Sequence, residues 1–141
     1  MTQEDKELLI RDLCSRLPYG VKCLFENSIE TIKGIWYDED EDWQIDGDKT
    51  STCIHAVKPY LFPISNMTIK QKIECFKGTD IELDEHNEIW SKCPTCIEDV
   101  IFTNIREWLK VINYLNVNHF DYKDLIKKGL AIDATNTNVY D

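Results

Sequence analysis

The fold of this chain depends on one stretch, VKCLFENSIETIKGIWY, which spans residues 21–37. Two runs rich in β-branched and aromatic residues, 21–26 and 29–37, flank Asn27-Ser28, a pair typical of a tight turn. Residues 43–45 and 52–57 are further short runs of this kind, separated by the turn dipeptide Asp46-Gly47. The pattern predicts a small, strongly curved antiparallel sheet over residues 21–57, and we consider an SH3-like barrel as its specific form.

Helical patterns flank this β-rich part. Before it, a capping-box pattern at Thr2 to Asp5 begins a helix that Pro18 ends. After it, Thr68 begins a short helix that we expect to bury Ile69, Ile73 and Phe76. A longer helix begins at Thr95, and its apolar stripe comprises Ile97, Ile101, Ile105, Trp108, Ile112 and Leu115. We expect a last short helix over residues 122–128.

These patterns predict the α+β class, with three to four helices packed on the sheet. A chain of 141 residues has the usual size of one domain, so we predict a single domain over residues 1–141. Its parts are an N-terminal helix at 1–17, the β-rich part at 21–57, a mainly helical part at 68–129 and a loose tail at 135–141.

The N-terminal residues and the hydropathy of the sequence indicate where in the cell the protein is found. The first residues are acidic, where a signal peptide would be basic and then apolar. No apolar run approaches the ~18 residues needed to cross a bilayer. We therefore expect a cytoplasmic protein without membrane contact, and we expect its thiols to be reduced. On this interpretation Cys14, Cys23 and Cys53 are small buried core residues.

The net charge of −10 is concentrated in two segments, 38–48 and 80–88, which hold 12 of the 26 acidic residues and none of the 16 basic ones. Such segments disfavour nucleic acid and favour a basic protein partner. Its predicted binding residues are Asp38, Glu39, Asp40, Glu41, Asp42 and Trp43. A solvated loop without a partner and an irregular cation site remain alternatives. An EF-hand loop is excluded because Trp43 and Lys49 stand where glycine and glutamate are required.

Cys93 and Cys96 form a CxxC pair at a predicted helix start, where the helix dipole would lower the pKa of a thiol. Three interpretations stay open: two structural thiols, a redox pair, or half of a zinc site completed by Cys53 and His55. Redox chemistry of the thioredoxin type also requires a later proline, and none follows Pro94. We predict no cofactor.

His119, Asp121 and Tyr122 could form an acid–base group, although no nucleophile lies near them in the sequence. We expect instead that Phe120 and Tyr122 anchor the chain to the core while His119 caps the preceding helix.

Three stretches resemble a known family. They are Arg16 to Gly20; Val57 to Pro63 with Ser65 and Met67-Thr68; and His119 to Tyr122 with Leu125-Ile126 and Gly129 to Ala131. They are similar to short uncharacterised proteins from gut bacteroidete genomes, prophages and phages, and Phe62 departs from the arginine of that family. The resemblance implies a mobile-element setting and no particular reaction.

Taken with the charge pattern, the resemblance favours a non-enzymatic accessory protein of a mobile element or phage that binds a protein partner. The alternative hypothesis is a zinc-stabilised or thiol-redox module that uses the Cys93–Cys96 pair.

Overall fold

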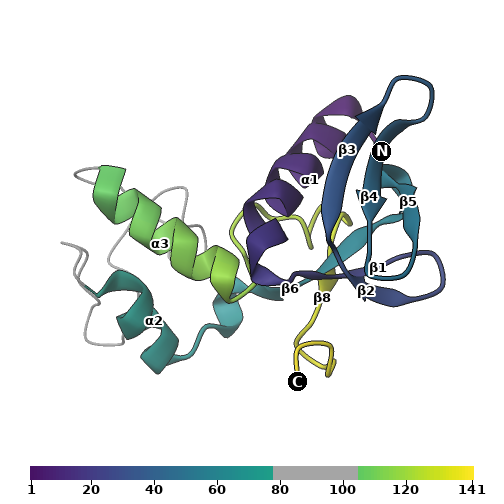
Figure 1. Cartoon of the computed structure of the whole chain (residues 1–141). Helices are drawn as coiled ribbons and strands as arrows, with labels where there is room; N and C mark the ends of the chain where they lie inside the picture. Colours follow the sequence, from purple (N-terminus) through teal and green to yellow (C-terminus); the bar gives the residue numbers. More distant parts are fainter. Residues whose placement is uncertain (78–104) are drawn as a thin grey trace. The chain divides into compact units, whose positions relative to one another are not determined.

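The structure is a computed structural model that describes residues 1–77 and 105–141 (Figure 1). These residues fall into two compact units, and each is described by itself. The first unit comprises residues 1–61 and 124–141, and the second comprises the described part of 62–123. Helices occur together with antiparallel and mixed sheets, so the predicted α+β class is confirmed. The prediction that the chain forms a single domain stays a prediction.

The first unit begins with helix α1, Gln3–Arg16. Its capping box forms as predicted: the Thr2 side chain accepts a hydrogen bond from the backbone of Asp5, and the Asp5 side chain accepts one from the backbone of Thr2. A 3-10 turn with Pro18 follows, and Gly20 then takes a left-handed conformation (φ 68°) that suits glycine. The predicted N-terminal helix is therefore correct to within one residue at its C-terminus.

Strands of the first unit form two sheets (Figure 1). In one, β1 (Lys22–Leu24) lies between β2 (Ile29–Thr31) and β6 (Lys58–Pro63), antiparallel to both. Strand β8 (Ile132–Asp133) pairs with β6 in parallel. The other sheet is an antiparallel meander of β3 (Gly34–Asp38), β4 (Asp42–Asp46) and β5 (Ser51–Cys53). A 3-10 helix, Ile54–Ala56, leads from β5 to β6.

The core of the first unit joins α1 to both sheets. Its fully buried side chains include Leu9 and Leu13 of α1, Cys23 of β1 and Ile45 of β4. Leu125, from the C-terminal segment, completes this cluster. Because the apolar residues of α1 recur at helical spacing, one face of the helix is buried here.

That buried face of α1 also carries an ion pair. The Arg16 guanidinium donates two hydrogen bonds to the Asp12 carboxylate, from Nε at 2.8 Å and from Nη2 at 3.1 Å. Both side chains are fully buried. A buried, doubly hydrogen-bonded pair of this kind is stable only while both partners are present.

A buried carboxylate connects the two sheets. Glu30 of β2 accepts hydrogen bonds from the Lys49 and Thr50 amides at 2.9 and 3.0 Å. It also accepts hydrogen bonds from the hydroxyls of Thr50 at 2.6 Å and Ser28 at 2.7 Å. Glu30 therefore holds the turn between β4 and β5 against β2. Gly47, in the same turn, leaves the space that this carboxylate occupies.

The second unit packs α2 (Ile69–Phe76) and α3 (Ile105–Val117) around a separate apolar cluster. Phe76 of α2 and Leu115 of α3 are buried in it, together with Phe120 of strand β7 (Phe120–Asp121). Strand β7 pairs in parallel with Phe62 and Pro63 at the end of β6. The capping box at Thr68 forms as predicted.

Several expectations are wrong. Ile69 and Ile73 are exposed, because α2 buries Cys75 and Phe76 instead. Cys14 is exposed on α1. Residues 122–128 form turns and not a helix, and the chain then enters β8.

The tail also differs from the loose segment that we expected. The Tyr140 hydroxyl accepts a hydrogen bond from the Lys22 amide at 3.1 Å and donates one to the Tyr60 carbonyl oxygen at 2.8 Å. Tyr140 therefore ties the C-terminal segment to β1 and β6.

The acidic segment at 80–88 and the predicted helix start at Thr95 lie outside the described residues, as do Cys93, Cys96, Ile97 and Ile101.

Candidate functional site

The acidic segment forms the turn of the β3–β4 hairpin (Figure 1). Asp38 pairs with Asp42, and the turn is closed by a 3.3 Å hydrogen bond from the Glu41 amide to the Asp38 carbonyl oxygen. The three residues between them, Glu39, Asp40 and Glu41, are exposed and are called the acidic tip below. Three adjacent carboxylates repel one another, so exposure to water is the arrangement that charge alone favours.

Asp42 differs from the acidic tip because its carboxylate contacts side chains from other parts of the chain. Its carboxylate forms an ion pair with Lys6 of α1, and the His55 Nε2 atom lies 3.5 Å from the same oxygen. The hydrogen bond from Lys6, together with one from the Trp43 amide, lowers the pKa of Asp42. Asp42 therefore fixes the hairpin to α1, and its predicted contact with a partner stays a prediction.

Two exposed aromatic residues on β3 were missed by the sequence analysis. Trp36 and Tyr37 have exposed fractions of 44% and 57%. The Tyr37 ring packs on Trp43 with ring centroids 5.3 Å apart, and the Trp36 Nε1 atom donates to Asp46 Oδ1 at 3.1 Å. Hydrogen bonds from Ser51 and Trp36 lower the pKa of Asp46, so this acceptor stays ionised. The two aromatic side chains thus have defined positions on the hairpin that carries the acidic tip.

Of the weak metal candidates, Cys53 and His55 lie in the described part of the chain, and they have different contacts. Cys53 Sγ lies 3.9 Å from the Glu41 carbonyl oxygen, whereas His55 faces Asp42. Within residues 1–77 and 105–141, no group of three or more His, Cys, Asp or Glu side chains is arranged to hold a metal ion. Cys93 and Cys96 lie outside these ranges, so the zinc and redox interpretations stay predictions.

The segment His119 to Tyr122 has the geometry of an anchor. Phe120 and Tyr122 are buried in the apolar cluster of the second unit, and the Tyr122 hydroxyl donates to Asn116 Oδ1 at 2.9 Å. The His119 amide donates to the Asn116 carbonyl oxygen at the end of α3. These contacts match the anchoring role that we expected.

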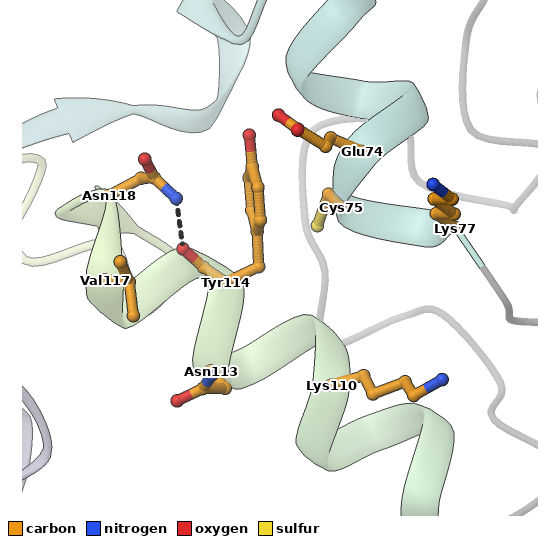
Figure 2. Close-up of a pocket in the computed structure, with 8 residues that line it drawn as sticks. All are labelled: Glu74, Cys75, Lys77, Lys110, Asn113, Tyr114, Val117 and Asn118. Atoms are coloured by element: carbon orange, nitrogen blue, oxygen red, sulfur yellow. Dashed lines mark hydrogen bonds between the residues drawn. The ribbon is translucent and has the colours of Figure 1, made fainter.

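A pocket of about 360 Å³ lies between α2 and α3 (Figure 2). The Cys75 thiol and the Tyr114 ring occupy the space between the helices. Burial raises the pKa of Cys75 to about 12, and burial with the nearby Glu74 charge raises that of Tyr114. Both groups are therefore protonated near pH 7 and are not poised as nucleophile or base. The remaining lining residues are Lys77, Lys110, Asn113, Val117 and Asn118.

The cysteines lead to a testable difference in reactivity. In the native protein Cys14 should react with a thiol reagent at least about 100-fold faster than Cys23 or Cys75. Burial raises the pKa of both slow thiols and blocks access, whereas Cys14 is exposed. Mass spectrometry of labelled peptides would assign each rate, with Cys14→Ser as the control. Equal rates for Cys14 and Cys75 would contradict the packing of α2.

Comparison with known proteins does not place the chain. No family model matches it, and no curated protein or solved structure is significantly similar to it. None of the described helices combines the length and apolar character required to span a membrane.

Proposed function

We propose that this chain is a non-enzymatic accessory protein of a mobile element or phage that binds a basic protein partner through the β3–β4 hairpin. One observation carries the proposal: two exposed aromatic residues, Trp36 and Tyr37, lie on the strand that leads into the acidic tip. The mobile-element setting is supported by the sequence resemblance alone.

The combination of residue types suits protein recognition. Tryptophan and tyrosine are enriched among the residues that dominate binding energy at interfaces. Clustered carboxylates attract a basic surface over a distance and increase the rate of encounter. The aromatic side chains would supply short-range contact area, while the acidic tip would supply attraction and orientation.

The strand order supports an SH3-like barrel as the scaffold of this hairpin. Strands β2 and β3 follow one another with only Ile32 and Lys33 between them, as two halves of one bent strand. The first half pairs with β1 and the second with β4, and β1 also pairs with β6. A 3-10 helix precedes β6, at the position where SH3-like barrels carry one before their last strand. In such a barrel the β3–β4 hairpin projects from one end.

The test replaces the three carboxylates of the acidic tip with neutral amides. The triple variant Glu39→Gln, Asp40→Asn, Glu41→Gln should keep its fold, because these side chains are exposed. Its association rate with a partner captured from host lysate should fall about tenfold at low salt, since steering by clustered charge is lost. The rate for the wild type should also fall as salt rises, and stopped-flow tryptophan fluorescence would measure both.

A matched control removes the same number of charges elsewhere. Glu26, Glu74 and Asp141 are exposed acids outside the hairpin, and their conversion to Gln, Gln and Asn should change the rate much less. A partner whose association rate is equal for the wild type and the hairpin variant would remove the acidic tip from the proposed function.

A further inference from the structure

Strand β3 is an edge strand. It is the first strand of the order β3-β4-β5, and β4 is the one strand that pairs with it among the described residues. Alternate residues of an edge strand direct their N–H and C=O groups away from the sheet, where another strand can bind them. Many edge strands are protected by lysine or proline. The sequence of β3, Gly-Ile-Trp-Tyr-Asp, contains neither.

The two faces of β3 differ in chemistry. Successive side chains of a strand point to opposite faces, so Trp36 and Asp38 share one face while Ile35 and Tyr37 share the other. On the first face, Trp36 contacts the Asp46 carboxylate, so an aromatic surface is combined with negative charge. On the second face, Ile35 packs against the core and Tyr37 against Trp43. A strand added to this edge would therefore meet an acidic aromatic face and an apolar face.

We infer that β3 binds an extended basic segment of the partner as an added strand, with Arg or Lys alternating with small or β-branched apolar residues. The inference rests on the proposed function and specifies its binding mode. The basic residues would lie beside Trp36, where a guanidinium can stack on the indole, and beside Asp38. The apolar residues would extend the surface formed by Tyr37 and Trp43. Main-chain hydrogen bonds supply affinity in such complexes, and alternate side chains supply specificity.

Charge complementarity favours a basic segment over a second copy of the chain as the added strand. A second copy of the chain could also pair at the edge, but it would bring its own acidic tip and a net charge of −10. The mutual repulsion of two such chains disfavours that pairing at low salt. A basic segment is instead attracted by the negative charge of the chain.

The experiment uses an eight-residue peptide in which Arg and Val alternate, blocked at both ends. Calorimetry would measure its affinity for the full chain, and NMR would follow the backbone amides of Gly34–Asp38. Two control peptides keep the charge. One carries N-methyl groups on alternate residues, which removes half of the main-chain donors, and the other rearranges the same residues into pairs, Arg-Arg-Val-Val. We expect each control peptide to bind at least about tenfold more weakly.

Variants of the chain test the same edge. Trp36→Ala should weaken binding of the alternating peptide about fivefold or more, because the stacking surface is lost. Ile29→Ala, which removes an exposed apolar residue from β2, should leave the affinity unchanged.

The outcomes separate the inference from the proposed function. Equal, salt-sensitive binding of all three peptides would overturn strand addition while supporting a basic partner. Failure of every basic peptide to bind even at low salt would count against both. Preference for the alternating peptide, with shifts of the β3 amides, would establish the added strand.

Discussion

Replacing Asp12 with Ala should lower the free energy of unfolding by about 3–5 kcal/mol, because it leaves the Arg16 guanidinium buried without its carboxylate. Both side chains are fully buried in the native chain and form two hydrogen bonds. Alanine is a good helix former, so the change should not disturb α1 itself. Urea unfolding followed by circular dichroism would measure the loss.

The control for this prediction removes both charges. The double variant Asp12→Leu, Arg16→Met fills the site with apolar side chains, and it should recover most of the stability lost in Asp12→Ala. The loss should also exceed that of Glu7→Ala, an exposed position on the same helix. If Asp12→Ala unfolds at the same urea concentration as the wild type, the pair does not contribute to stability.

Local signals in the sequence predict the elements that depend on a few neighbouring residues. The helix from Thr2 and the short helix from Thr68 begin where their capping boxes place them. The turns at Asn27-Ser28 and at Asp46-Gly47 separate strands as expected. In each case the turn or cap is formed by side chains and backbone within four residues, so the sequence contains all the information required.

Elements that depend on distant contacts could not be predicted. Strands β7 and β8 have two residues each, and they exist because β6 pairs with them. The helical pattern at 122–128 becomes a series of turns that lead the chain back to β6. An amphipathic helix also does not reveal which of its apolar residues meet a partner, so Ile69 and Ile73 were wrongly placed in the core.

The candidate site was found by its charge, while its aromatic half was missed. The acidic tip is evident as the middle of five consecutive carboxylates, whose repulsion disfavours burial. Trp36 and Tyr37 belonged to the predicted β-rich run 29–37, in which no residue was assigned to the surface. Because side chains alternate along a strand, Ile35 and Trp36 point to opposite faces of the sheet. The sequence alone does not show that the face with Trp36 is exposed to solvent. Solvent exposure of large apolar residues is a property of the assembled sheet.

The second large effect concerns Glu30 and Gly47. Glu30→Ala should lower the melting temperature by roughly 10 °C, because the Lys49 and Thr50 amides lose their acceptor. Gly47→Ala should lower the free energy of unfolding by about 1–3 kcal/mol. A Cβ atom at residue 47 would lie 2.1 Å from Glu30 Oε2 and 3.0 Å from Glu30 Cβ. In the Glu30→Ala background that collision is largely relieved, so Gly47→Ala should cost less there. If the stability losses of the two single variants add up in the double variant, the contact between Gly47 and Glu30 is contradicted.

The dependence of stability on pH tests the charge of the same carboxylate. Hydrogen bonds, first from the Thr50 hydroxyl, lower the pKa of Glu30 from 4.5 to about 2. A lowered folded-state pKa contributes stability that is fully present above pH 4.5 and is lost as the pH falls toward 2. Glu30→Gln has no titrating group, so the wild type should be more stable than this variant at pH 7 and the difference should shrink between pH 4.5 and 2. Thermal melts of both proteins across that range would measure it, and a constant difference would mean that the Glu30 charge does not hold the turn.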